Sequence, residues 1–141
     1  MIRNRLRLSK GFSLIEILLV LAVIGILSAI AIPSFLGQRH RARVIGDAIT
    51  NAKSLAMALE SRKAETGIYG APGSYPWTAA GARPSTDIAP SFVPTGNSKM
   101  DFKVDINADS LSYTLTVTDP TLSNKMVYQT DQTGAQLFRW N

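Results

Sequence analysis

The apolar positions of this chain follow two helical patterns and then an alternating one. Between Ile17 and Gln38 no residue is charged, and nearly every side chain is apolar. A run of 18 or more such residues is a candidate membrane span, because about 20 helical residues cross a hydrocarbon core of roughly 30 Å. The pattern predicts a span over residues 12–35, in which Gly25 and Pro33 are the weakest helical positions.

The second pattern continues the helix to about residue 64. Apolar residues recur there at steps of three or four, which places them on one face of a helix. Arg62, Lys63 and Gly67 are typical of a helix C-terminus. The sequence therefore predicts one long helix over residues 12–64, and the apolar stripe of its second half consists of Ile45, Ala48, Ile49, Ala52, Leu55, Ala56 and Leu59.

The remaining residues, 65–141, are expected to form a small globular head. Residues 66–98 are rich in Pro and Gly and predict a long loop, held to the head by Tyr69, Tyr75, Trp77 and Phe92. Residues 100–140 alternate apolar and polar positions, which predicts an antiparallel meander. Its four strands are expected over 102–106, 111–117, 126–130 and 135–140, with turns at 107–109 and 131–134. The predicted fold class is α+β, a four-stranded antiparallel sheet packed on the helix stripe.

The net positive charge of the chain comes mostly from its first eleven residues. The chain carries 15 basic and 10 acidic residues, a net charge of +5. Four of the basic residues are Arg3, Arg5, Arg7 and Lys10, in a segment without acids that is typical of a processed leader. Without that leader, 11 basic residues face 10 acidic ones. The basic balance is therefore no indication of nucleic-acid binding.

The sequence offers little catalytic or metal-binding chemistry. It has no cysteine and one histidine, His40, and no Gly-rich phosphate loop follows a strand. Asp101, Asp105 and Asp109 recur at every fourth residue, but on a strand and turn they are interpreted as solvated positions and not as a calcium site. We expect no enzyme, no cofactor and no metal.

The N-terminal residues resemble a known family. A basic segment ends at Lys10-Gly11, an aromatic residue follows at Phe12, and Glu16 precedes the long apolar run. This arrangement resembles the type IV pilins and the type II secretion pseudopilins. The resemblance implies that a prepilin peptidase removes residues 1–11 by cleaving between Gly11 and Phe12, and that Phe12 is then N-methylated. An ordinary secretory signal cleaved after Ala29-Ile30-Ala31 is the competing interpretation, and it leaves Gly11, Phe12 and Glu16 without a role.

Glu16 has two interpretations that do not exclude each other. Its carboxylate could pair with the free amine of Phe12 on a neighbouring subunit, which would set the register of assembling helices. Alternatively, Ser13 and Glu16 have the spacing of a capping box, in which the two residues satisfy each other's backbone donors. Gly25 and Pro33 are likewise either tolerated within a membrane helix or the ends of a segment that kinks or melts on assembly.

A basic cluster follows the span at Arg39, His40, Arg41 and Arg43. Long basic side chains at this position can extend to the lipid interface. The sharper alternative is contact with anionic lipid or with acidic residues of a neighbouring subunit.

The family resemblance implies a structural function. The precursor would span the inner membrane once with its head in the periplasm, and the pilus assembly machinery would move subunits into an extracellular helical filament, a homo-oligomer with residues 12–35 at its core. Such a filament would serve adhesion, twitching motility or DNA uptake. The alternatives are a pseudopilin in a periplasmic pseudopilus, or a minor pilin that binds through residues 66–98. No residue pattern supports DNA or a particular surface ligand.

Overall fold

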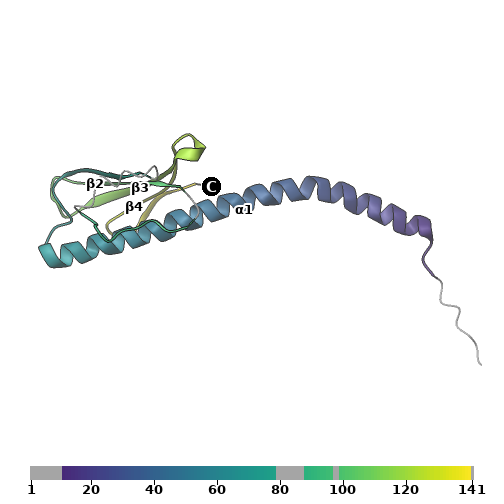
Figure 1. Cartoon of the computed structure of the whole chain (residues 1–141), viewed down its shortest axis with the longest axis horizontal. Coiled ribbons are helices and arrows are strands. Elements are labelled where there is room, and N and C mark those ends of the chain that lie inside the picture. The colour runs from purple at the N-terminus through teal and green to yellow at the C-terminus, as the bar shows by residue number, and fades with distance from the viewer. Residues whose placement is uncertain (1–10, 79–87, 97–98, 141) are drawn as a thin grey trace, which may run out of the picture. The chain divides into compact units, whose positions relative to one another are not determined.

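The computed structural model describes residues 11–78, 88–96 and 99–140. The expected leader, apart from Gly11, and the middle of the expected 66–98 loop lie outside these residues. The chain divides into two compact units, residues 1–39 and residues 40–141. The elements of the second unit are seen in Figure 1.

Helix α1 spans Leu14–Thr66, close to the predicted 12–64. It begins where the carbonyl of Ser13 accepts hydrogen bonds from the N–H groups of Glu16 and Ile17, at 3.1 and 3.3 Å. It ends at Gly67, whose φ of +85° lies in the left-handed region that favours glycine. The Gly67 N–H donates to the Lys63 carbonyl at 2.8 Å, which is the αL type of helix cap. The expected C-terminal cap is therefore confirmed.

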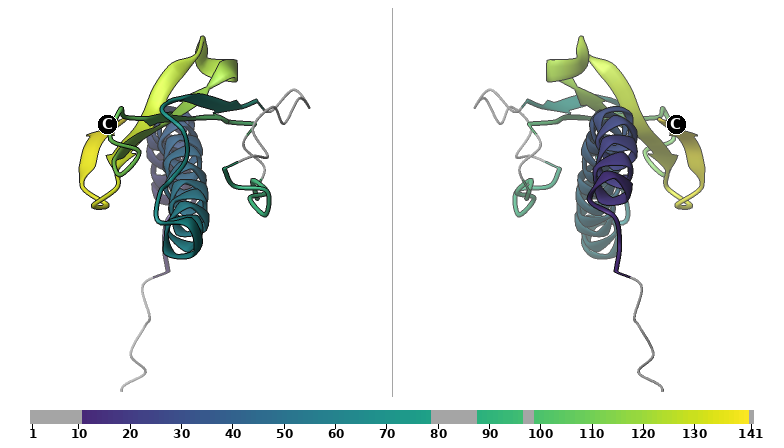
Figure 2. Two further views of the ribbon diagram at one scale, coloured as in Figure 1. Left: turned by 90° about the vertical axis from the view of Figure 1, so that its left-hand side faces the viewer. Right: turned by 90° about the vertical axis from the view of Figure 1, so that its right-hand side faces the viewer.

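The second unit packs an antiparallel sheet on the C-terminal half of α1. The sheet has five strands in the order β1-β2-β3-β4-β5, so each strand pairs with its neighbour in sequence. The strands are β1 Gly73–Trp77, β2 Asp101–Ile106, β3 Tyr113–Asp119, β4 Lys125–Asp131 and β5 Gln136–Arg139. A short 3₁₀ helix, Pro120–Leu122, lies between β3 and β4. Figure 2 shows the β4–β5 hairpin on one side of the helix and residues 88–96 on the other.

The prediction of four strands was wrong, because β1 lies within the segment expected to be a loop. Tyr75 and Trp77 of β1 stand opposite Val104 and Phe102 of β2, so the aromatic residues that were expected to hold the loop do so partly as a strand. Pro76 lies within β1, although proline has no N–H to donate to a ladder. β1 is an edge strand and has a neighbour on one side only, which is where a sheet tolerates proline.

The core lies between the sheet and the expected stripe of α1. Ala48, Ala52, Leu55 and Leu59 have no exposed surface. The strands contribute Phe102, Val104, Leu115, Val117 and Val127, and the segments around β1 contribute Tyr69, Trp77, Ile88 and Phe92. Phe92 makes edge-to-face contacts with both Trp77 and Phe102, at centroid distances of 6.0 and 5.4 Å. The amphipathic prediction for the helix is confirmed, and the aromatic residues near β1 complete the core.

A buried amide holds residues 93–96 against the helix. Asn51 is 3% exposed, and its side-chain N–H donates to the Thr95 carbonyl at 2.8 Å while its side-chain oxygen accepts from the Thr95 N–H at 2.8 Å. The side chain thus pairs with Thr95 as another peptide group would, and both polar partners are satisfied. Gly96 follows with φ +97°, and a Cβ there would lie 3.0 Å from the carboxylate of Asp47. Only glycine fits both conditions.

Candidate functional site

The N-terminal part of α1 exposes its apolar side chains along its whole length. Phe12 is 80% exposed, and the large apolar residues that follow remain exposed through Leu36. Within the described residues, α1 is the one helix that is long and apolar enough to cross a membrane. A contiguous apolar surface of this kind marks a membrane or protein contact. The expected span of residues 12–35 therefore coincides with the largest exposed apolar surface in the described part of the chain.

The expected cleavage and methylation site lies just before this helix. Gly11, Phe12 and Ser13 are in irregular backbone and are exposed. A Cβ built on Gly11 would meet no atom within 4 Å, so nothing in the described residues covers the junction. The Gly11–Phe12 bond is thus sterically open. Phe12 lies two residues before Leu14, the first residue of α1, and Glu16 lies in the first turn of that helix.

Glu16 is exposed in the first turn of α1. A carboxylate at this end is favourable, because the helix dipole is positive there. Among the described residues, the Glu16 side chain forms neither an ion pair nor the hydrogen bond expected of a capping box. Ser13 accepts through its backbone carbonyl only. The expected capping box is therefore not seen among residues 11–78, 88–96 and 99–140.

Gly25 and Pro33 both lie inside α1. Proline has no N–H to donate to the carbonyl four residues earlier, so the helix lacks one hydrogen bond at Ala29. No atom comes within 4 Å of a Cβ built on Gly25, so tertiary packing does not require glycine there. Kinking or melting between the two residues stays a prediction.

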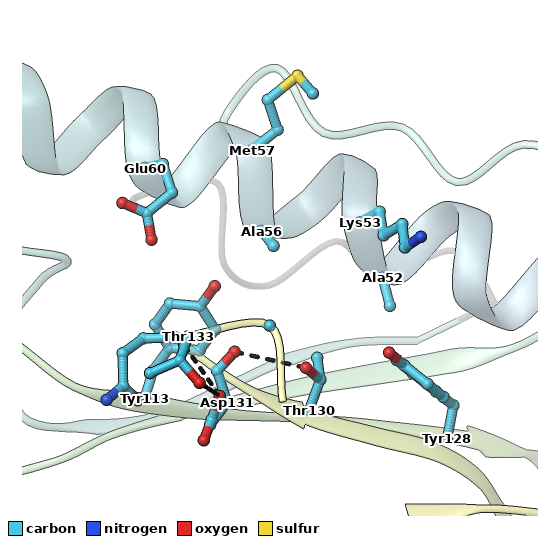
Figure 3. Close-up of a pocket in the computed structure, with 12 residues that line it drawn as sticks. Ala52, Lys53, Ala56, Met57, Glu60, Tyr113, Tyr128, Thr130, Asp131 and Thr133 are labelled. Atoms are coloured by element: carbon cyan, nitrogen blue, oxygen red, sulfur yellow. Dashed lines mark hydrogen bonds between the residues drawn. The ribbon is translucent and has the colours of Figure 1, made fainter. Parts of the chain in front are cut away.

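The head has a pocket of about 290 Å³ between α1 and the β4–β5 turn. Figure 3 shows the helix side chains on one side and the turn on the other. The helix contributes Ala52, Lys53, Ala56, Met57 and Glu60, and the sheet contributes Tyr113, Tyr128, Thr130 and residues 131–134. This pocket was not predicted from the sequence. The sequence feature that indicates the pocket is the pair Ala52 and Ala56. These two residues lie one helical turn apart, and their small side chains leave space beside the helix.

The Asp131 carboxylate beside the pocket stabilises the β4–β5 turn through hydrogen bonds. The Asp131 carboxylate accepts from the Thr133 hydroxyl at 2.7 Å and from the N–H groups of Thr133 and Ala135 at 2.9 and 3.1 Å. These bonds, led by that of the Thr133 hydroxyl, lower the pKa of Asp131. Asp109 has a similar role in the β2–β3 turn, where hydrogen bonds from the Leu111 N–H and the Ser112 side chain lower its pKa. Both carboxylates have a structural function in turns.

The described residues contain no group of three or more His, Cys, Asp or Glu side chains placed to hold a metal ion. Asp101, Asp105 and Asp109, which recur at every fourth residue of the sequence, have different surroundings in the structure. Asp105 forms an ion pair with Lys103 at 2.8 Å, and Asp109 belongs to the turn described above. Asp101 begins β2. The geometry supplies no reason to revise their interpretation as surface residues.

Two buried tyrosines lie under the end of the sheet. Tyr69 and Tyr113 are each 1% exposed and contact edge to face at 4.8 Å between ring centroids. Burial raises the pKa of Tyr113 to about 12, with the nearby carboxylates of Glu60 and Asp131 adding to the effect. Burial also raises the pKa of Tyr69, whose hydroxyl donates to Glu60 at 2.5 Å.

These tyrosines predict a loss of stability at alkaline pH. A phenol whose pKa is higher in the folded chain stabilises the fold below its ordinary value of 10.0, and this contribution declines as the pH rises toward about 12. We expect the free energy of unfolding, measured by urea titration of the detergent-solubilised chain, to fall over that interval. The double variant Tyr69→Phe/Tyr113→Phe should reduce the slope. A wild-type stability that is level from pH 10.0 to about 12 would contradict the assignment.

Comparison with known proteins supports the N-terminal assignment. Residues 6–32 match the family model described as the prokaryotic N-terminal methylation motif. A fimbrial protein of Neisseria meningitidis serogroup A is 36% identical over 88 residues, 61% of this chain and 48% of the relative. The type IV major pilin protein PilA of Myxococcus xanthus is 44% identical over 61 residues, 43% of this chain and 27% of PilA.

A secretion protein is also similar to this chain. The type II secretion system core protein G of Vibrio cholerae is 31% identical over 66 residues, 47% of this chain and 44% of the relative. The chain spans about half the length of the fimbrial protein, and no solved structure gives a significant match. The matched motif contains the Gly11–Phe12 junction, Glu16 and most of the exposed apolar helix. That motif and these relatives support the assignment of this chain to the type IV pilin and type II secretion pseudopilin superfamily.

Proposed function

We propose that this chain is a structural subunit of a type IV pilus and has no catalytic role. The observation that carries the proposal is the exposed apolar helix that directly follows an open Gly11–Phe12 junction inside the methylation motif. A water-exposed surface of this kind is stable only in a membrane or among similar helices. A subunit that moves from bilayer to filament meets both conditions in turn.

In the proposed processing step, a prepilin peptidase cleaves between Gly11 and Phe12 and releases the leader, residues 1–11. The new amino group of Phe12 is then methylated. The irregular, exposed backbone of residues 11–13 supports access to this bond. The mature chain would consist of a helix whose residues 12–35 form the span and later the filament core, and a head over residues 65–141.

In the proposed assembly step, the Glu16 carboxylate of one subunit pairs with the Phe12 amine of a neighbour. Both groups would lie among apolar helices, where removal of one partner of a buried pair costs about 3–5 kcal/mol. The lack of any partner for Glu16 within the described residues supports an intermolecular role. Gly25 and Pro33 would allow the helix between them to adapt to filament packing.

Before assembly, the precursor would cross the inner membrane once with its head in the periplasm. Assembly machinery in that membrane would transfer it to a homo-oligomeric, extracellular filament. The exposed residues 12–36 support a single anchoring helix. Adhesion, twitching motility or DNA uptake is the proposed use of the filament, and no described feature supports DNA or a particular surface ligand as a partner.

A second candidate function is that of a pseudopilin in a periplasmic pseudopilus. The similarity to the secretion core protein G over 66 residues favours it. A third is a minor pilin that binds through residues 66–98. Part of that segment is β1 and the buried Trp77 and Phe92, which leaves fewer of its residues for contact than a free loop would offer.

Mass spectrometry of filaments sheared from the native cell surface tests the pilus proposal. We expect an abundant chain that begins at Phe12 and is heavier by one methyl group. A processed chain that stays in the membrane fraction, absent from sheared material, would contradict the major-subunit role and favour the pseudopilin. A chain that begins after Ala31 would contradict prepilin processing altogether.

A further inference from the structure

Two cations from distant parts of the chain meet over one indole ring. The Arg41 guanidinium lies 4.9 Å from the centroid of the Trp140 ring, and the Lys125 ammonium lies 4.7 Å from it. Arg41 is on α1, Lys125 begins β4, and Trp140 follows β5. The backbone places Trp140 there, because its N–H donates to the Val127 carbonyl at 2.9 Å.

Neither cation is neutralised by a carboxylate of the described residues. Since both lie within 5 Å of the same centroid, they are at most roughly 10 Å apart, a distance over which charges still interact at 0.1 M salt. Asp119 stands opposite Lys125 in the sheet register, but it is 4% exposed and accepts from the N–H and hydroxyl of Thr121. An anion bound beside Trp140 would therefore relieve the repulsion between the two cations.

The position of this cluster in the chain indicates which anion it meets. Arg41 lies five residues after Leu36, the last residue of the continuous run of exposed large apolar side chains that begins at Phe12, or about 7.5 Å along a helix. It also precedes Val44 and Ile45 by three and four residues, so it extends the buried face of α1 toward the N-terminus. Any membrane crossed by the apolar segment ends close to Arg41, and tryptophan is the residue enriched at that interface.

We propose that Arg41, Lys125 and Trp140 form a site for the anionic headgroups of the membrane on the head side of the span. The inference rests on the proposed membrane anchoring of the precursor. Lipid phosphates would neutralise the two cations, and the half-buried indole would lie at the headgroup level. Arg43 and Arg139 are exposed nearby in sequence and would add to the attraction. The site would hold the head on the bilayer until the subunit is assembled.

The test uses the full chain in nanodiscs with and without phosphatidylglycerol, in which brominated lipid quenches tryptophan fluorescence. Trp77 is 3% exposed and is shielded from lipid, so the quenched signal reports Trp140, and Trp140→Phe verifies the assignment. We expect quenching to increase with phosphatidylglycerol and to decrease with added sodium chloride. A head is docked when Trp140 is quenched by the lipid and undocked when it is not. The double variant Arg41→Gln/Lys125→Gln should lower the ratio of docked to undocked heads by roughly fivefold for each basic residue removed.

The matched control is Lys53→Gln/Lys99→Gln, which removes two exposed charges elsewhere on the head and should leave quenching unchanged. Quenching that does not depend on phosphatidylglycerol, or that falls equally in both double variants, contradicts the lipid site. The lipid site is also contradicted if duplex DNA binds through Arg41 and Lys125 while lipid composition has no effect on quenching. A chain that leaves the nanodisc contradicts the membrane anchoring itself, whereas a retained chain with insensitive Trp140 contradicts only the lipid site.

Discussion

Glu16→Ala should abolish filaments while cleavage at Gly11–Phe12 continues. The proposed cleavage site is an exposed junction ahead of the helix, whereas the Glu16 carboxylate is proposed to neutralise the Phe12 amine of a neighbour inside the filament. Loss of one partner leaves a buried charge in every subunit, at about 3–5 kcal/mol each. Electron microscopy of sheared material counts the filaments, and immunoblotting of the membrane fraction separates processed from unprocessed chain.

Two further variants separate pairing from helix capping. Glu16→Gln keeps the shape of the side chain without its charge and should also lack filaments. Ser13→Ala removes the N-cap hydroxyl, at a typical cost of about 1 kcal/mol, and should retain them. Normal filaments from Glu16→Ala would contradict the pairing, and loss of filaments in Ser13→Ala would assign the effect to the helix start.

Leu55→Ala should produce the second large effect, on the stability of the head. Leu55 has no exposed surface and belongs to the hydrophobic core between α1 and the sheet. Truncation of a buried leucine costs about 2–5 kcal/mol, from lost burial and from the cavity that remains. Domains are stable by only about 5–15 kcal/mol, so the variant should lose a large part of the stability of the head.

Urea unfolding of the full chain in detergent measures this loss, with the fluorescence of the buried Trp77 as reporter. Met57→Ala is the matched control on the same helix, two residues away. Met57 is 74% exposed, so its truncation should change the unfolding free energy by no more than about 0.5 kcal/mol. Equal shifts for the two variants would contradict the assignment of Leu55 to the core.

The sequence by itself determined the features that depend on neighbours along the chain. The exposed apolar run, the stripe from Ile45 to Leu59 and the cap at Gly67 were predicted correctly, because helical periodicity and capping act over a few residues. The same holds for the turn at 131–134, whose Gly134 has a φ of +78°. The motif in residues 6–32 is likewise local, which is why it supports the family assignment from so little of the chain.

Only the tertiary structure decided which distant residues meet. β1 carries a proline and a weak strand pattern, so its pairing with β2 depends on Trp77 and Tyr75 lying beside Phe102 and Val104 of the adjacent strand. The pair of Asn51 with Thr95 and the meeting of Arg41, Lys125 and Trp140 join segments far apart in sequence. No local pattern records such contacts, because their energy comes from burial and charge shared between elements that come together only in the folded head.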